Sequence, residues 1–219
     1  MAKKTKGTPK DEAEQAATNA DSKLDASTLK TALADLEKGT GGIKEIKGHR
    51  SLDGSLDITI KGELKDPLPR DSPQTPNFNK QPPSGSEIGL SDHEIAHLWG
   101  PGFGDEARDG MMYAPTEVNQ VLQNRTIEDR LRELHKLARR EGATIEVTAR
   151  ATSHPLQTWR GHEMLKDVSY RFDVRFTDGS TYRIGEVDIS VPPPTSSGTS
   201  SGRFTYKVRG GSLGVWSLK

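Results

Sequence analysis

Alternating apolar and polar residues predict most of the strands in this chain. Residues 55–64, Ser-Leu-Asp-Ile-Thr-Ile-Lys-Gly-Glu-Leu, alternate with period two, which is typical of a strand with one buried face. The Asp178-Gly179 pair predicts a tight turn between two further strands. The other segments that we expect to form strands are 111–114, 144–149, 168–176, 181–187, 203–208 and 213–218.

Helical spacing of apolar residues appears in two other parts of the chain. A short helix is expected at 27–37, where three leucines share one stripe before a Gly-rich stretch. Two consecutive helices are expected after Pro115, which suits a first helical turn. Thr126 with Asp129 resembles an N-cap, so we expect a break near residues 124–125 before the second helix. That helix has an apolar face and ends at Gly142.

Composition divides the chain into two parts. All twelve aromatic residues lie at Phe78 or later, and residues 66–86 contain six prolines. Residues 1–85 hold twelve Lys and two Arg, whereas residues 86–219 hold four Lys and thirteen Arg. A segment without aromatic residues has little to bury. We therefore expect residues 1–86 to be a mostly disordered arm and linker with one short helix and one strand, and residues 87–219 to be one α+β domain.

Charge and cysteine content exclude several classes of protein. Lys+Arg and Asp+Glu are 31 each, so the chain is not a wholly basic nucleic-acid coat, although a local basic face is compatible with this balance. Without Cys there are no disulfides, no thiolate metal sites and no Cys nucleophile. The longest apolar run has four residues, which excludes a transmembrane helix and the apolar core of a signal peptide.

Two chemical hypotheses compete for His97. In the first, His93-Glu94-x-x-His97 is a zincin-like pattern: on a helix both imidazoles would bind one Zn²⁺ while Glu94 activates water. Glu117 is the candidate third ligand. The Gly100-Pro101-Gly102 run leaves little room for that helix.

The second hypothesis places His97 before a long loop, a strand at 111–114 and a helix, in a ββα arrangement. His97 would act as general base and deprotonate the water that attacks phosphate. A hard cation such as Mg²⁺ prefers amide and carboxylate oxygens, and Asn119 lies in the first turn of the expected helix.

A family resemblance supports the second hypothesis. The run His97-Leu98, then Met112 to Gln120 (Met-Tyr-Ala-Pro-x-x-Val-Asn-Gln), then Ile127-Glu128, resembles the His-Me finger of DNA/RNA non-specific endonucleases, especially the toxin-type branch at the C-termini of bacterial polymorphic toxins. The resemblance covers roughly residues 88–195. It implies His97 as base, Asn119 as metal ligand, Glu128 as supporting acid, and a ββα centre packed on an antiparallel sheet.

Three features depart from that family pattern. Ile95-Ala96 stands where the family has Arg-Gly, and the loop between His97 and Asn119 is unusual. On a straight α-helix, residues 119 and 128 would lie about 180° apart at about 100° per residue. The assignment therefore needs the expected helix break. Without that break Glu128 is not in the site, and Asn124, which is close to it in sequence, is the substitute.

The resemblance implies a toxin that cleaves nucleic acid and is restrained by an immunity protein in the producing cell. Without a signal peptide, we expect secretion or injection through a delivery apparatus that engages the N-terminal arm, or a piece of a larger toxin, with no membrane partner. A non-catalytic binding module delivered by that arm is the remaining alternative. The arginines that we expect to contact nucleic acid, or else to form a salt-bridged surface, are Arg108, Arg125, Arg132, Arg139 and Arg140.

Overall fold

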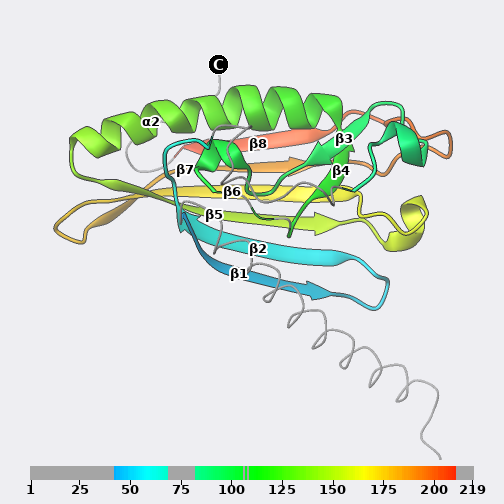
Figure 1. Ribbon diagram of the computed structural model, residues 1–219, viewed down its shortest axis with the longest axis horizontal. Coiled ribbons are helices and arrows are strands. Elements are labelled where there is room, and N and C mark those ends of the chain that lie inside the picture. The colour runs from blue at the N-terminus through cyan, green and yellow to red at the C-terminus, as the bar shows by residue number, and fades with distance from the viewer. Residues whose placement is uncertain (1–41, 69–81, 106, 108, 211–219) are drawn as a thin grey trace, which may run out of the picture.

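Six antiparallel strands form the main sheet, in the order β1-β2-β5-β6-β7-β8 (Figure 1). This computed structural model describes residues 42–68, 82–105, 107 and 109–210, without the side chains of residues 121, 122, 124–126 and 157. The strands are β1 (Ile43–Arg50), β2 (Leu56–Glu63), β5 (Thr144–Ser153), β6 (Leu165–Arg175), β7 (Thr181–Ser190) and β8 (Thr205–Gly210). The expected helix at 27–37 and strand at 213–218 lie outside the described residues.

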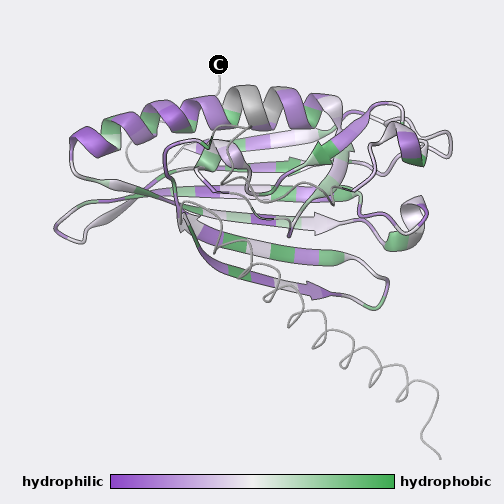
Figure 2. Ribbon diagram, in the orientation of Figure 1, coloured by the Kyte–Doolittle hydropathy of each residue, from purple (hydrophilic) through white to green (hydrophobic). Residues whose placement is uncertain are grey.

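The alternation predicted from the sequence separates the two faces of the sheet. Ala149 of β5 is buried and lies opposite Ile60 of β2 and Tyr170 of β6, both of which are also buried. The intervening positions carry charged side chains in cross-strand ion pairs, such as Arg175 with Glu63 and Glu146. Figure 2 shows hydrophilic and hydrophobic residues alternating along these strands. One face therefore forms the core, and the other is polar.

A long helix covers the apolar face (Figure 1). It begins as the π-helix η3 (Glu117–Glu128) and continues directly as α2 (Asp129–Arg140). Ile127, Leu131 and Leu134 are buried in the same core as the inward residues of the sheet. The expected break at residues 124–125 is wrong: Glu128 has helical dihedrals, and only the winding changes there.

A second, two-stranded sheet precedes the helix. Strands β3 (His93–Ala96) and β4 (Met112–Pro115) pair antiparallel, and the loop at 97–111 between them contains the short turn η2 (Pro101–Phe103). The order of elements is that of a ββα unit, which does not by itself identify a His-Me finger. The expected strand at 111–114 and the α+β class are confirmed.

The domain begins earlier than the sequence indicates. The predicted strand at 55–64 is present as β2, but β2 pairs with β5, and β1 pairs with β2. Ile43, Ile46 and Ile58 belong to the main core. Residues 43–63 are thus an integral part of the sheet, which corrects the expected boundary at 86/87. The physical reason is that aliphatic residues without any aromatic ring supply enough apolar surface for these two strands.

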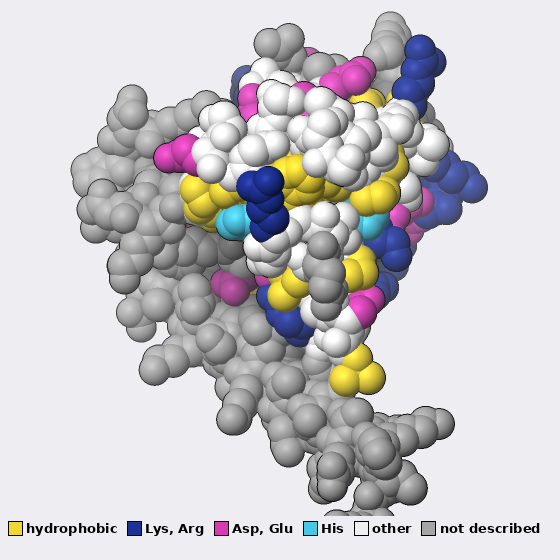
Figure 3. All heavy atoms as spheres, turned by 90° about the vertical axis from the view of Figure 1, so that its right-hand side faces the viewer, with side chains coloured by type: hydrophobic (Ala, Val, Ile, Leu, Met, Phe, Trp, Pro, Cys, Tyr) yellow, Lys and Arg dark blue, Asp and Glu magenta, His cyan; other side chains and the backbone are white. Residues whose placement is uncertain are grey.

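A second, smaller hydrophobic core lies at the end of the molecule where the turns η1 (Ser86–Ile88) and η4 (Leu156–Trp159) are found. Ile88, Tyr113, Trp159 and Met164 pack together there, and the Trp159 indole donates to the carbonyl of Ile88. Figure 3 looks onto this end, where hydrophobic side chains form a band at the surface. Within the described part of the chain, no helix is both long and apolar enough to span a membrane.

Candidate functional site

His97 lies directly after β3, at the start of the loop that joins the two strands of the small sheet. The residue is half-buried. A Cβ built on Gly100 would lie 3.4 Å from His97 Cβ and 3.7 Å from Glu128 Oε1. The imidazole and the carboxylate therefore flank the same glycine, although the two residues are 31 positions apart.

Glu128 lies against the next glycine of this loop. A Cβ on Gly102 would overlap Glu128 Oε2 and would lie 3.2 Å from Arg132 Nη2. Arg132 Nη2 donates to Glu128 Oε2 over 3.2 Å, and Nη1 donates to Asp129 Oδ1 over 2.9 Å. The side chain of Glu128 is 15% exposed and that of Arg132 is 40% exposed. Only glycine at 102 lets the loop approach this ion pair so closely.

On a straight α-helix Asn119 and Glu128 would lie on opposite sides, but η3 is a π-helix, which changes their relative direction. Hydrogen bonds that span five residues instead of four give a wider turn, so about nine residues make two turns. The helix thus brings both residues toward the hairpin without a break. They nevertheless contact different parts of it, because Asn119 lies against β3 and Glu128 against the loop that follows.

Asn119 belongs to a separate polar group at β3. Its amide Nδ2 donates to Glu94 Oε2 over 3.1 Å and to the carbonyl of Ile95 over 3.4 Å. Gln120 Nε2 donates to both oxygens of Glu94, over 2.8 and 2.9 Å. The carboxylate of Glu94 and the amide carbonyl of Asn119 supply oxygen atoms of the type that Mg²⁺ prefers. Glu94 was a candidate only in the zincin hypothesis and Asn119 only in the His-Me finger hypothesis. In the structure these two residues are in contact.

A buried hydroxyl supports the loop behind His97. Tyr170 donates to the carbonyl of Leu98 over 3.4 Å and accepts from Gln123 Nε2 over 2.9 Å. Burial raises the pKa of the Tyr170 phenol well above its usual range, and the nearby charge of Glu128 adds to this effect. The phenol is therefore neutral and fixes the backbone beside His97. The sequence did not indicate Tyr170 or Gln123, because they lie on elements far apart in the chain.

The zincin arrangement is not formed. His93 and Glu94 lie on strand β3, not on a helix, so His93 and His97 do not share a helical face. Glu117 is exposed at the start of η3. Among the described residues, no three His, Asp or Glu side chains are grouped in a way that could hold a metal ion.

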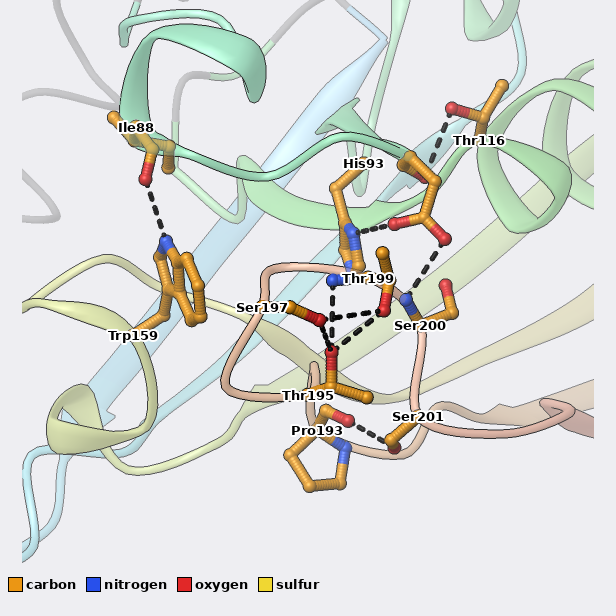
Figure 4. Close-up of polar contacts among 11 residues, drawn as sticks. Ile88, His93, Thr116, Trp159, Pro193, Thr195, Ser197, Thr199, Ser200 and Ser201 are labelled. Carbon is orange, nitrogen blue, oxygen red and sulfur yellow. Dashed lines mark hydrogen bonds and ion pairs between the residues drawn. The ribbon is translucent and has the colours of Figure 1, made fainter.

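His93 instead belongs to a structural junction (Figure 4). Its Nδ1 lies 2.7 Å from Asp92 Oδ1, and the His93 side chain is 1% exposed. The other carboxylate oxygen of Asp92 accepts from the Ser200 backbone N–H over 2.9 Å. The Asp92 carbonyl accepts from the backbone and hydroxyl of Thr116. Burial lowers the pKa of His93, against the opposing effect of Asp92.

The arginines expected to contact nucleic acid fall into different environments. Arg132 lies at the candidate site, beside Glu128. Arg139 is exposed and pairs with Asp66 over 2.6 Å, and Arg140 is exposed near the end of α2. Arg108 lies outside the described residues, as do the side chains of Arg125 and of the alternative ligand Asn124.

Comparison with known protein families found one match. Searches of curated proteins and of solved structures gave no match. Residues 90–189 match the family Ntox4, described as bacterial toxin 4. The matched region runs from just before β3 to near the end of β7 and includes His97, Glu128, Arg132 and Tyr170. The match supports a bacterial toxin domain in this part of the chain.

Proposed function

We propose that this toxin domain cleaves phosphodiester bonds in nucleic acids. The observation that supports the proposal is the convergence of His97, Glu128 and Arg132 on the glycines of the 97–102 segment. An imidazole and a carboxylate can each exchange a proton with a reacting hydroxyl. A guanidinium binds phosphate through its planar fork. Acid–base groups and a phosphate-binding cation are what phosphodiester cleavage requires.

The elements around His97 and Glu128 are consistent with nucleic-acid cleavage. His97 follows the first strand of a ββα unit, as in the His-Me finger that the sequence resembles. His97 is partly exposed as a residue, and the protein encloses its Nε2 atom, so the surrounding core fixes the position of the imidazole. The Tyr170 hydroxyl holds the adjacent Leu98 carbonyl, which limits movement of the loop. These features preorganise a group that must act on a bound phosphate.

We propose that Glu94 and Asn119 are the groups that would hold a divalent cation, most suitably Mg²⁺. Both present oxygen ligands, and Gln120 orients the Glu94 carboxylate. A bound cation would supply positive charge to a nearby phosphate. Apart from that contribution, Asn119 and Gln120 orient Glu94, and His97 moves the proton.

A toxin with this activity requires protection of the cell that makes it. We propose an immunity protein with an acidic surface, because α2 exposes Arg139 and Arg140 in its last turn. We also propose that the protein acts after secretion or injection into a target cell.

The test is incubation of the purified chain with plasmid DNA, total RNA and casein, each with Mg²⁺, with Zn²⁺ and with a chelator. We expect cleavage of at least one nucleic acid and intact casein. His97→Ala should lose that cleavage while its melting temperature stays near that of the wild type. Casein hydrolysis, or a folded chain that leaves both nucleic acids intact in all conditions, would overturn the proposal.

A further inference from the structure

We infer that the substrate of this site is RNA, and that the attacking group is the ribose 2′-hydroxyl next to the cleaved phosphate. The inference rests on the proposed function and goes further by naming the substrate class and the nucleophile. It comes from which side chains surround Gly100 and Gly102. The nearest atoms around both glycines belong to only three side chains, those of His97, Glu128 and Arg132.

These three side chains have complementary charges and exposures. The ion pair with Arg132 favours the ionised carboxylate of Glu128, which is then a proton acceptor. The imidazole of His97 is of the type that can give a proton to a leaving oxygen. Arg132 is more exposed than Glu128, so part of its guanidinium remains accessible to a phosphate. The site therefore offers a base, an acid and a phosphate-binding cation.

Gly100 and Gly102 let the loop lie directly against His97, Glu128 and Arg132. Gly100 and Gly102 place no side chain between the loop and the two proton-transfer groups. The candidate cation ligands are arranged differently, because Asn119 and Glu94 bond to each other and to the backbone of β3. At the glycines, the groups that can activate a nucleophile and protonate a leaving oxygen are thus Glu128 and His97.

The reaction balances with these groups alone. Glu128 takes the proton of the 2′-hydroxyl, and the 2′-oxygen forms a bond to phosphorus. The bond between phosphorus and the 5′-oxygen breaks, and the imidazolium of His97 gives its proton to that oxygen. The products are a 2′,3′-cyclic phosphate and a 5′-hydroxyl end. Glu128 and His97 return to their starting states by exchanging protons with solvent. DNA lacks the 2′-hydroxyl and cannot react in this way.

The test compares three oligonucleotides of one sequence: RNA, DNA and RNA with 2′-O-methyl groups throughout. The full chain is incubated with each in the presence of a chelator and again with Mg²⁺, and mass spectrometry identifies the product ends. We expect cleavage of the RNA in both conditions, with 2′,3′-cyclic phosphate ends. The DNA and the methylated RNA should stay intact.

Each outcome separates this inference from the proposed function. Cleavage of DNA, or RNA products with 5′-phosphate ends, would overturn the inference and leave the proposed function in place, because water would then be the nucleophile. Cleavage of RNA only with Mg²⁺ would also overturn it. No cleavage of any oligonucleotide by the folded chain would refute both.

Variants of the carboxylate give a second test. Glu128→Gln should lower the RNA cleavage rate by about 10²–10⁴-fold, because an amide cannot accept the proton. Glu133→Gln is the matched control, since Glu133 is an exposed residue of the same helix that pairs with Arg130. The control should cleave at the wild-type rate.

The pH dependence of the rate distinguishes proton transfer from a structural role. The wild-type profile should be bell-shaped, because the reaction needs both an ionised carboxylate and a proton donor. Arg132→Lys keeps a positive charge beside Glu128 and should keep both limbs at a reduced rate, which provides a test if Glu128→Gln does not fold. An active Glu128→Gln variant that retains the acidic limb, or an Arg132→Lys variant with a flat profile, would overturn the inference.

Discussion

Two histidines four residues apart in sequence lie in opposite environments in this fold. His93 begins β3, has a side chain that is 1% exposed, and bonds to Asp92, which itself joins Ser200 and Thr116. His97 follows the same strand, is partly exposed, and lies with Glu128 close to Gly100. Both are histidines near a carboxylate, but only the site of His97 also holds Arg132, a cation that can bind phosphate.

A histidine near a carboxylate is therefore not in itself a catalytic site. At the His93 junction the carboxylate of Asp92 also bonds to the Ser200 backbone N–H, and little of the imidazole is open to solvent. Such a group holds segments together. At the His97 site, glycines bring the loop directly against Glu128 and Arg132. Burial and neighbouring groups, not residue type, distinguish the two histidines.

Truncation of each histidine tests most strongly whether His93 and His97 differ in their contribution to cleavage. We expect His97→Ala to lower nucleic-acid cleavage by about 10²–10⁴-fold, the usual effect of removing a positioned acid or base. His93→Ala should retain activity per folded molecule. The measurement is the initial cleavage rate normalised to the folded fraction from circular dichroism. Equal losses in both variants would remove the distinction.

A methyl group at Gly102 tests the close approach of loop and helix. Gly102→Ala would place a Cβ onto the Glu128 carboxylate and displace it. We expect a rate loss of about 10²-fold, since a shift of about 1 Å at a reacting group has effects of this size. Gly202→Ala is the control, because its nearest neighbour, Pro192 Cγ, is 3.9 Å away. Wild-type activity in Gly102→Ala would show that the carboxylate position is unimportant.

The two histidine substitutions should affect stability in the opposite order to activity: His93→Ala should destabilise the fold more than His97→Ala. His93→Ala removes a buried side chain and leaves Asp92 without its imidazole partner. We expect the free energy of unfolding to fall by about 2 kcal/mol, as for other buried polar groups that lose a partner. His97→Ala should change it by much less. Urea titrations of both variants measure this, and a larger loss for His97→Ala would contradict the assignment.

Acidic pH should weaken the fold through its buried histidines. Burial lowers the pKa of His93, His135 and His154 below their ordinary 6.5. The unfolded chain then binds protons at higher pH than the folded chain, so their stabilising effect is present above pH 6.5 and is lost as the pH falls below it. Neighbouring carboxylates oppose this lowering of the pKa: Asp92 at His93, Asp66 at His135 and Asp167 at His154. Neighbouring cations add to it: Arg139 and Lys65 at His135, and Lys166 at His154.

The measurement is the urea midpoint between pH 7.5 and 5. We expect the urea midpoint to fall as the pH is lowered. His93→Gln should make this fall smaller, whereas His49→Gln, at an exposed position of β1, should leave it unchanged. A midpoint that rises on acidification, or an equal response of the two variants, would contradict the prediction.

Local sequence patterns predicted the strands better than the helix. The period-two run at 55–64 became β2 because its apolar positions face the core. β1 was missed because Ile43 and Ile46 are three residues apart, and a register irregularity after Ile43 lets both be buried. The capping pattern at Thr126 predicted a break that the continuous η3–α2 helix does not have. Nothing in the local sequence signals π winding.

The candidate site was predictable only in part. His97, Asn119 and Glu128 were singled out by spacing and by resemblance. The contact between Glu94 and Asn119 depends on pairing of elements 25 residues apart, which local patterns do not encode. The glycines of the 100–104 segment indicated a turn-rich loop. Their second role, to bring Gly102 against Glu128, depends on how the helix packs on the hairpin.

The most direct test of the central claim, that His97 transfers a proton during nucleic-acid cleavage, is chemical rescue. The cleavage rate of His97→Ala is measured with and without added imidazole, under conditions where the variant is folded. Free imidazole can enter the vacated space and exchange the same proton, so we predict a rate that rises with imidazole concentration and that stays flat for His93→Ala. An inactive but folded His97→Ala variant that imidazole does not restore, or one that is fully active without it, would contradict the account.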